Sequence, residues 1–584
     1  MNYLQRKLLS LDTLNETRWF LWILRTLAIL LGLVHTWAAV ISQSMNADGI
    51  SYLDMGDAYM RGDWEVAINS VWSPMYAWIL GGVLRIVKPP MEYEFPLVHV
   101  VNFGVFLLAL VCFEFLWRQL WKYQKQILTK DESAVWKTFP HWIWWGLGYS
   151  IFVFSSLHLI EIWSVTPDML MSAFVYLAAG LVVHIRMGNT GWKFFILLGV
   201  ILGLGYLAKA VMFPISLVFL GVSLFTTKKY RQSMPRVLVS ILFFLIISLP
   251  FTIVVSIHEG RLTISDAGKL TYARYINGVP YPHWQGEPAG NGTPLHPSHL
   301  IFDHPPIYEF GEPVGGTYPI TYDPFYWYEG VTVHADLARQ VDYILFSLMY
   351  YSDLLLRQQP GLLLGVILLY WIGRSRTLSW RDYPLRWGLV IVAIAAFVFY
   401  GVVNVIGRYI GVFLVLLWAD LLANIRIPRE QVSKNLASLI GILMIALLVL
   451  NIVATNLSGY RDLSGKANPH QEVFVDGVPP AWPGEVAQAL HGLGVKQGEK
   501  VAIIGYGFDA FWARLARVKI VAEMLDYQAT DFWLGNKDFQ QEVLQVFAST
   551  GARAVVAEYV PSYARLDGWQ QVGASNFFIY MFTE

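Results

Sequence analysis

The sequence predicts a mainly α-helical, polytopic membrane protein with extracytoplasmic loop elements and a small α/β domain at its C-terminal end. Two observations carry this prediction. Of the 584 residues, 55% are hydrophobic and only 14% are charged, whereas a soluble protein has about 25% charged residues. Apolar runs of about 20 residues, the length at which a helix crosses a bilayer, recur from the N-terminal region to residue 456.

The apolar runs predict about eleven membrane-spanning helices. The first run, from Trp19 to Ile41, exceeds the roughly 7–15 residues of a signal-peptide core and is expected to remain as a span. Two pairs of short runs, separated at Lys209 and at Arg408, could be broken helices. The expected spans are residues 19–41, 96–117, 141–157, 168–186, 194–208, 210–226, 236–257, 360–373, 386–404, 409–425 and 434–456.

Lysine and arginine clusters occupy alternate connections between these runs, as the positive-inside rule requires of cytoplasmic loops. This pattern predicts a multi-pass protein of the cell (inner or plasma) membrane with a cytoplasmic N-terminus and an extracytoplasmic C-terminal domain. The outer face then receives the loops 42–95 and 258–340, so the expected domains are 1–457 and 458–584. The clusters are Arg6, Lys7 and Arg18; Arg118, Lys122, Lys125, Lys130 and Lys137; Arg186 and Lys193; Lys228, Lys229, Arg231 and Arg236; Arg374, Arg376, Arg381 and Arg386; and Arg426, Arg429 and Lys434.

The C-terminal part alternates strand-like and helical segments, which predicts a three-layer α/β domain. The strand-like segments are VAIIGYG (501–507), KIVAEML (519–525), ARAVVAEY (552–559) and FFIYMFT (577–583). GYGFDA (505–510) matches the G-x-G-x-x-A of dinucleotide sites, and Asp526 follows about 20 residues later. Because this domain is predicted to lie outside the cytoplasm, no nucleotide cofactor is expected.

The balance of 42 basic and 42 acidic residues says nothing about a nucleic-acid partner, and none is expected. Cys112 is the one cysteine of the sequence, so an internal disulfide is excluded.

Five acidic residues follow the first predicted span, in the stretch Asn46 to Tyr76. They are Asp48, Asp54, Asp57, Asp63 and Glu65, and any one of them could belong to the solvated face of a surface helix. Asp54 and Asp57 are also candidates for substrate binding. Asp48 differs because it lies directly at the exit from the membrane. A partly desolvated carboxylate there gains basicity and can meet an acceptor hydroxyl from the aqueous side, so Asp48 is the candidate general base.

A second acidic site is expected in the connection SLHLIEIWSVTPDML (156–170). Glu161 is the second catalytic candidate, since an acid among apolar residues at membrane depth is costly and usually functional. His158 and Asp168 are candidates for substrate binding in the same connection. Asp168 also follows Thr-Pro and could simply begin a helix, where its charge favours the helix dipole.

Lys209 and Arg408 fall near the predicted outer face, where the positive-inside rule does not place cations. Each could extend to lipid headgroups. Together, beside an acidic loop, they suggest a clamp for a phosphate or diphosphate, with bidentate contacts from arginine and a point charge from lysine. Tyr409, next to Arg408, is included in this donor phosphate site.

The loop 258–340 is too long for a simple connection and is rich in histidine and aromatic residues. Tyr272, His283 and Trp284 could stack against a sugar or could pack the loop. The histidines of HPSH and DHPP are not spaced as in a structural metal site, and a divalent metal remains an open possibility.

Taken together, these segments resemble the GT-C superfamily of integral membrane glycosyltransferases. The resemblance is strongest to the bacterial branch of protein mannosyltransferases, aminoarabinose transferases and rhizobial lipopolysaccharide core transferases. It covers about residues 19–425 and is carried by DGISYLDMGDAYMRGDW, SPMYAWILGG, TPDMLMSAF, GLGYLAKA and GRYIGVFL.

The resemblance implies inverting transfer of a sugar from a polyprenyl-phosphate donor outside the cytoplasmic membrane. It also implies that Asp48 is the base and that Lys209 and Arg408 hold the lipid phosphate. The sequence departs from the family by reading Ala-Asp-Gly at Asp48, without an adjacent acidic pair. The second acid is therefore left open between Asp54, Asp57 and Glu161.

The sequence thus predicts a glycosyltransferase whose partners are a polyprenyl-phosphate sugar, a glycan, lipid or protein acceptor, and the bilayer. A transporter or lipid flippase is the main alternative, although it would need polar residues along a path through the membrane, and these acids cluster at one face. A third interpretation treats the C-terminal domain as a sensor or partner-binding module on a membrane anchor.

Overall fold

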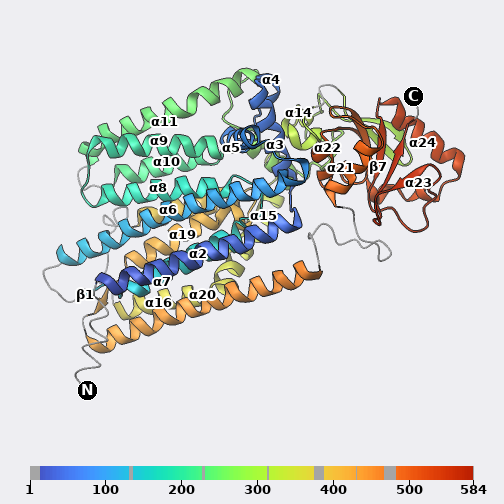
Figure 1. The fold of residues 1–584 in the computed structure, drawn as a ribbon. Coiled ribbons are helices and arrows are strands. Elements are labelled where there is room, and N and C mark those ends of the chain that lie inside the picture. Colours follow the sequence, from blue (N-terminus) through green and yellow to red (C-terminus); the bar gives the residue numbers. More distant parts are fainter. Residues whose placement is uncertain are drawn as a thin grey trace.

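The computed structural model describes residues 14–130, 136–225, 230–311, 315–373, 387–428, 430–465 and 482–582. A bundle of long helices forms one part of the molecule, and a sheet-containing domain lies against one end of that bundle (Figure 1). Several of the basic residues used for the topology prediction fall outside the described residues. They are Arg6, Lys7, Lys228, Lys229, Arg374, Arg376, Arg381, Arg386 and Arg429.

Within the described residues, each of the eleven predicted apolar runs overlaps a helix of the bundle. These helices are α2 (Leu14–Ser42), α6 (Glu94–Lys130), α7 (His141–Phe154), α8 (Asp168–Arg186), α9 (Trp192–Ala208), α10 (Met212–Leu224), α11 (Tyr230–His258), α16 (Pro360–Gly373), α18 (Gly388–Gly401), α19 (Gly407–Ala423) and α20 (Gln431–Gly465). The chain leaves its helical path between α9 and α10 and between α18 and α19, next to Lys209 and Arg408 respectively.

Eleven membrane crossings are not confirmed. Among the described residues, five helices are long and apolar enough to cross a membrane, or six if Leu337–Gln358 and Pro360–Gly373, bent by 81°, form one span. Helices of 13 to 17 residues such as α10 and α9 are about 20–25 Å long, which is shorter than the roughly 30 Å hydrocarbon core. The long apolar helices nevertheless indicate a multi-pass membrane protein.

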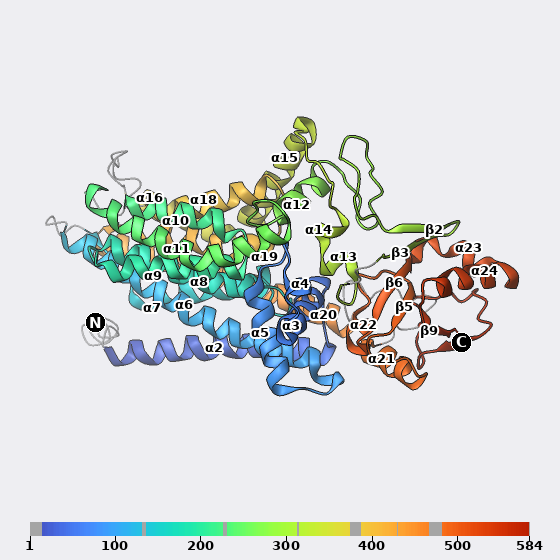
Figure 2. The same cartoon turned by 90° about the horizontal axis from the view of Figure 1, so that it is seen from above.

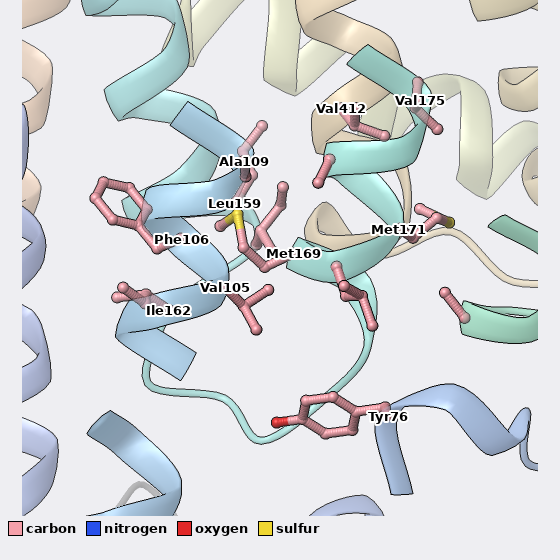
Figure 3. Packing of buried hydrophobic residues seen from close by; sticks show 14 of the residues in the cluster. Tyr76, Val105, Phe106, Ala109, Leu159, Ile162, Met169, Met171, Val175 and Val412 are labelled. Atoms are coloured by element: carbon pink, nitrogen blue, oxygen red, sulfur yellow. The ribbon is translucent and has the colours of Figure 1, made fainter. Parts of the chain in front are cut away.

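Large apolar and aromatic side chains fill the interior of the bundle. Trp117 on α6 stacks on Trp144 on α7 with ring centroids 4.6 Å apart, and Phe113 stacks on Phe152 at 4.9 Å. Figure 3 shows the part of this core near Tyr76, where side chains of α6, α8 and α19 pack together. These ring contacts pack α6 against α7 in the interior of the bundle.

Short helices connect the bundle to the sheet domain. α2 runs from the far end of the bundle to this junction, so the stretch that follows it lies between the two parts (Figures 1 and 2). The elements near this end are α3 (Ala47–Arg61), α4 (Trp64–Ala67), α5 (Pro74–Val87), η2 (Met91–Tyr93), the π-helix η3 (Ser155–Leu159), α12 (Ala267–Tyr275), α13 (Pro319–Tyr322), α14 (Pro324–Trp327), α15 (Leu337–Asp353) and the π-helix η4 (Leu354–Gln358).

A seven-stranded sheet forms the centre of the second part, in the order β2-β3-β6-β5-β7-β9-β8. Its strands are β2 (His299–Asp303), β3 (Pro306–Glu309), β5 (Lys500–Ile504), β6 (Lys519–Met524), β7 (Ala554–Ala557), β8 (Trp569–Gln571) and β9 (Phe578–Met581). β5 pairs in parallel with β6 and β7. The helices of this part are α21 (Pro483–Gly492), α22 (Phe511–Ala516), η6 (Asp526–Gln528), α23 (Thr530–Leu534) and α24 (Lys537–Ser549). A separate pair, β1 (Trp136–Lys137) and β4 (Ile427–Pro428), lies at the other end of the bundle (Figure 1).

The sheet is larger than the C-terminal segment alone. β2 and β3 come from the loop 258–340, and β3 pairs antiparallel with β6 through Tyr308 and Glu523. Without β3, the edge of β6 would expose unpaired backbone groups. Two strands of the long loop therefore belong to the same sheet as the strands of the C-terminal segment.

Candidate active site

Asp48 lies in the first turn of α3. Two neighbours fix this turn against the connection that follows η3. The side chain of Asn46 accepts a hydrogen bond from the backbone N–H of Val165 at 2.9 Å. At Gly49, a Cβ would lie only 2.7 Å from the Cβ of Val165, so α3 can approach this closely only with glycine there.

Arg408 lies at the start of α19 and forms an ion pair with Asp48. Its Nη2 lies 2.8 Å from Oδ2 of Asp48. The glycine before it permits this position, since a Cβ at Gly407 would lie 3.1 Å from the carbonyl oxygen of Leu159. The first turns of α3 and α19, 360 residues apart in sequence, therefore meet beside the η3 connection.

Lys209 and Asp168 form a second ion pair beside the first. Lys209 occupies the break between α9 and α10, and its Nζ also lies 4.0 Å from the centroid of the Tyr409 ring. Burial lowers the pKa of the Lys209 ammonium, Asp168 and Asp48 oppose this change, and Arg408 adds to it. The four charged side chains therefore form one electrostatic cluster, which we call the four-charge site.

The four-charge site retains hydrogen-bonding capacity. The side chains of Asp48, Arg408 and Lys209 are 30%, 23% and 20% exposed, so a ligand can reach them. Nε of Arg408 and Oδ2 of Asp168 are buried and have no hydrogen-bond partner among the described residues, and the same is true of the Tyr400 hydroxyl. Tyr400 stacks on Tyr409 with centroids 5.0 Å apart. Arg408 and Tyr400 therefore each keep one donor that no described residue uses.

Glu161 lies next to the four-charge site, in the turn after η3. Its backbone has a φ of 59°, the left-handed region that non-glycine residues seldom occupy. Burial raises the pKa of Glu161 to about 7, and nearby Arg408 opposes the increase. The carboxyl group is therefore close to half-ionised at neutral pH.

Asp168 begins α8, as the Thr-Pro-Asp pattern predicts, but its side chain caps no backbone N–H of that helix. The carboxylate binds Lys209 instead. Asp168 therefore begins the helix without capping it, and its role in substrate binding stays a prediction.

Asp54 and Asp57 do not join the four-charge site. Each forms an ion pair with Arg514 of the C-terminal domain, at 2.7 Å and 2.8 Å respectively. They lie two to three turns further along α3 than Asp48, on the part of the helix that contacts the sheet domain.

The candidate residues of the long loop mainly pack the loop against the sheet domain. His283 is buried, lies 2.9 Å from Ser298 Oγ and 2.8 Å from Glu523 Oε2, and stacks on Tyr308. Trp284 is 2% exposed and donates to the carbonyl oxygen of Glu287. Sugar stacking on either ring would require the loop to open.

Tyr272 and His158 are half-buried. Tyr272 lies on α12, and its carbonyl oxygen accepts hydrogen bonds from the N–H groups of Ile276 and Asn277. His158 lies in η3, with its ring 5.0 Å from that of Phe154. Neither contact places these side chains in the four-charge site.

Within the described ranges, no group of three or more His, Cys, Asp or Glu residues could hold a metal ion. A cleft of about 1270 Å³ lies elsewhere, between the second half of α3, the end of α5 and the C-terminal domain. Its walls include Asp57, Arg85, Tyr322 and Arg517, and none of the four charged site residues lines it.

Sequence reasoning missed Tyr400 beside the four-charge site, and it missed Arg514 and Glu94 where the sheet domain meets the helices. Tyr400 had no distinguishing pattern, because it ends an ordinary apolar helix. Arg514 and Glu94 could have been flagged, since each is a charge inside or beside an apolar run, FWARLA and EFPLVHVV.

The chain matches no protein-family model and no curated protein sequence. Among solved structures it is similar to ArnT from Cupriavidus metallidurans bound to undecaprenyl phosphate, with a TM-score of 0.49 and 12% identity over 96% of this chain and 97% of that one. The apo state of that protein gives a TM-score of 0.47 at 11% identity, covering 95% and 97% of the two chains.

The chain is also similar to the oligosaccharyltransferase of Archaeoglobus fulgidus tethered with an acceptor peptide, with a TM-score of 0.44 and 11% identity over 91% of this chain and 68% of that one.

Proposed function

We propose that the protein is a glycosyltransferase that moves a sugar from a polyprenyl-phosphate-linked donor to an acceptor on the extracytoplasmic side of the membrane. The observation that carries this proposal is the four-charge site. It places a partly exposed carboxylate, Asp48, beside two cations that have access to a ligand. This arrangement suits a reaction in which the acceptor hydroxyl must lose a proton and the lipid phosphate must leave as an anion.

In this reaction Asp48 accepts the proton of the acceptor hydroxyl as its oxygen attacks the anomeric carbon of the sugar. The bond between that carbon and the phosphate oxygen breaks, and the electron pair stays on the phosphate. Arg408 and Lys209 stabilise the negative charge that develops there, so no general acid is needed. Attack on the face opposite to the phosphate inverts the anomeric carbon.

The test is to supply purified protein with labelled polyprenyl-phosphate sugars, with and without membrane extract. We expect one sugar donor to be consumed, and its label to move to a component of the extract. Consumption of none of the donors under these conditions would contradict the proposal. The identity of the labelled product would show whether the acceptor is a glycan, a lipid or a protein.

The ionisation of Glu161 should make donor binding depend on pH. Its pKa of about 7 means that a negative charge appears near Arg408 as the pH rises through neutrality. A phosphodiester keeps one negative charge throughout this range, so donor affinity should fall as the pH rises from 6 to 8. Bound phosphate raises the pKa of Glu161 further, because its negative charge disfavours the carboxylate. Donor affinity should fall by up to roughly tenfold for each pH unit of that increase.

Donor binding by the Glu161→Gln variant, measured across the same pH range, should lack this dependence and stay at the low-pH affinity. Glu259→Gln is the matched control. Burial also raises the pKa of Glu259 to about 7, but its charged neighbours are Asp266, Asp323 and Arg261. A pH dependence that disappears in Glu259→Gln and persists in Glu161→Gln would contradict the assignment.

The proposal places the C-terminal domain and Asp48 on the same, extracytoplasmic side. A reporter that is active only outside the cytoplasm should therefore be active when fused after Glu584. The same reporter inserted near Lys125, at the other end of α6, should be silent. A silent C-terminal fusion would show that this domain faces the cytoplasm and would remove the proposed orientation.

A further inference from the structure

An arginine of the C-terminal domain lies buried among three carboxylates of the helical part. Arg514, on α22, is 2% exposed, and its Nη1 lies 2.7 Å from Asp54 and 2.8 Å from Asp57. Its Nε donates to Glu94 at 2.8 Å. Arg517 binds the same Asp57 and Glu94, each at 2.5 Å. We call these five residues the Arg514 network.

The Arg514 network joins the helix that carries Asp48 to the α/β domain. Asp54 and Asp57 are on α3, and Asp54 also accepts hydrogen bonds from the backbone N–H and the hydroxyl of Thr317, at 2.6 Å and 3.0 Å. A buried ion pair gains little net stability, because desolvation offsets the Coulomb attraction, but it requires its partners in a defined geometry. The network therefore fixes the orientation of α3 more than it stabilises the fold.

Asp48 lies six residues before Asp54, which is about 9 Å along the helix axis. The start of α3 is held by Asn46 against Val165, and the network holds the middle of the helix. Two separated attachment points determine the direction of a helix, and thereby the place of the carboxylate at its first turn.

We propose that Arg514 is a positioning residue that holds α3 so that Asp48 meets Arg408 and the acceptor hydroxyl. This inference rests on the proposed role of Asp48. It gives the C-terminal domain a role in transfer, because the domain orients α3 and thereby completes the active site. The domain would then not be an independent module on a membrane anchor.

The test compares donor KM and kcat in the Arg514→Gln variant, alone and combined with Asp48→Asn. Because a displacement of about 1 Å can cost a hundredfold in rate, we expect kcat to fall roughly ten- to a hundredfold with donor KM nearly unchanged. Arg514→Lys should recover part of the loss. In the Asp48→Asn background, Arg514→Gln should have almost no further effect on kcat, since its effect acts through Asp48.

Equal losses from Arg514→Gln in both backgrounds would mean general damage and would overturn the proposal, as would an unchanged kcat. Arg565→Gln, at an exposed arginine of the same domain, is the matched control and should leave kcat unchanged. If Arg514→Gln does not fold, Arg517→Gln at a 33% exposed site should show the same pattern at smaller amplitude, and equal losses in both backgrounds there would also overturn the proposal.

Backbone amide exchange gives a readout that does not depend on transfer. In Arg514→Gln, or in Arg517→Gln if that is the variant that folds, exchange at residues 47–53 should become faster while α8 and α19 keep their protection. Unchanged exchange in α3 would overturn the positioning role. A wild-type protein that transfers no sugar, with this exchange difference present, would instead contradict the proposed function and leave the structural coupling standing.

Discussion

The Asp48→Asn variant is expected to lose transfer while it binds the donor almost normally. Asparagine keeps the shape of the side chain and an oxygen that can accept from Nη2 of Arg408, 2.8 Å away in the wild type, but it cannot take up a proton. Loss of a general base typically costs about a hundred- to ten-thousandfold in rate. The defect should therefore appear in turnover and not in donor affinity.

Asp54→Asn and Asp57→Asn are the controls for this substitution, because both residues lie on the same helix. Each contacts Arg514 instead of Arg408 and keeps its hydrogen-bonding oxygen as asparagine. Each should therefore reduce turnover by no more than Arg514→Gln does, and by less than Asp48→Asn does. If Asp48→Asn kept more than about a tenth of normal turnover with a verified acceptor, the assignment of Asp48 as the base would be wrong.

Lys209→Ala and Arg408→Ala are each expected to weaken donor binding. Loss of one charged hydrogen-bonded contact to phosphate costs about 1.5–3 kcal/mol, or roughly ten- to a hundredfold in Kd. Direct binding of a labelled polyprenyl-phosphate sugar measures the effect. Unchanged affinity in both variants would show that these cations only reach lipid headgroups.

The ion pairs require a control for folding. Lys209→Ala leaves the carboxylate of Asp168, which is 1% exposed, without its partner, and an unpaired buried charge can cost about 3–5 kcal/mol of stability. The double variant Lys209→Met, Asp168→Asn removes both charges of the pair, so no unpaired buried charge remains. It should fold more stably than Lys209→Ala and still bind the donor weakly.

Much of the helical fold could be predicted because membrane helices follow from local composition. The bounds of α8 and α16 coincide with their apolar runs, 168–186 and 360–373. The number of crossings could not be predicted in the same way. A run such as α9, with 17 residues, is apolar enough for a membrane but too short to settle whether it crosses alone.

Two residues of the four-charge site could be selected from the sequence because they depart from the charge pattern of the surrounding segments. Lys209 and Arg408 are cations near the face that the sequence predicts to be the outer one, where the positive-inside rule does not place them. The structure brings both to the Tyr409 ring, with Arg408 paired to Asp48. The partner of Asp168 could not be predicted from the sequence. The pattern of a helix start gives no information on Lys209, which is 41 positions later in the chain and binds the Asp168 carboxylate.

Contacts between segments that are far apart in the chain could not be predicted from the sequence. Arg514 reaches Asp54 across 460 positions, and β3 of the long loop pairs with β6 more than 200 residues later. Hydrophobic periodicity identifies each element but carries no information on such partners. The coupling between the C-terminal domain and α3 therefore emerges only from the structure.

The most direct test of the central claim follows both bond cleavage and lipid movement in proteoliposomes that contain the purified protein. A polyprenyl-phosphate sugar labelled in the sugar is supplied with the acceptor fraction. We predict that the label leaves the lipid and appears on the acceptor with the wild-type protein, and that Asp48→Asn lowers this transfer by about a hundredfold or more. A labelled lipid that crosses the bilayer with its sugar–phosphate bond intact would identify a transporter or flippase and contradict a transferase.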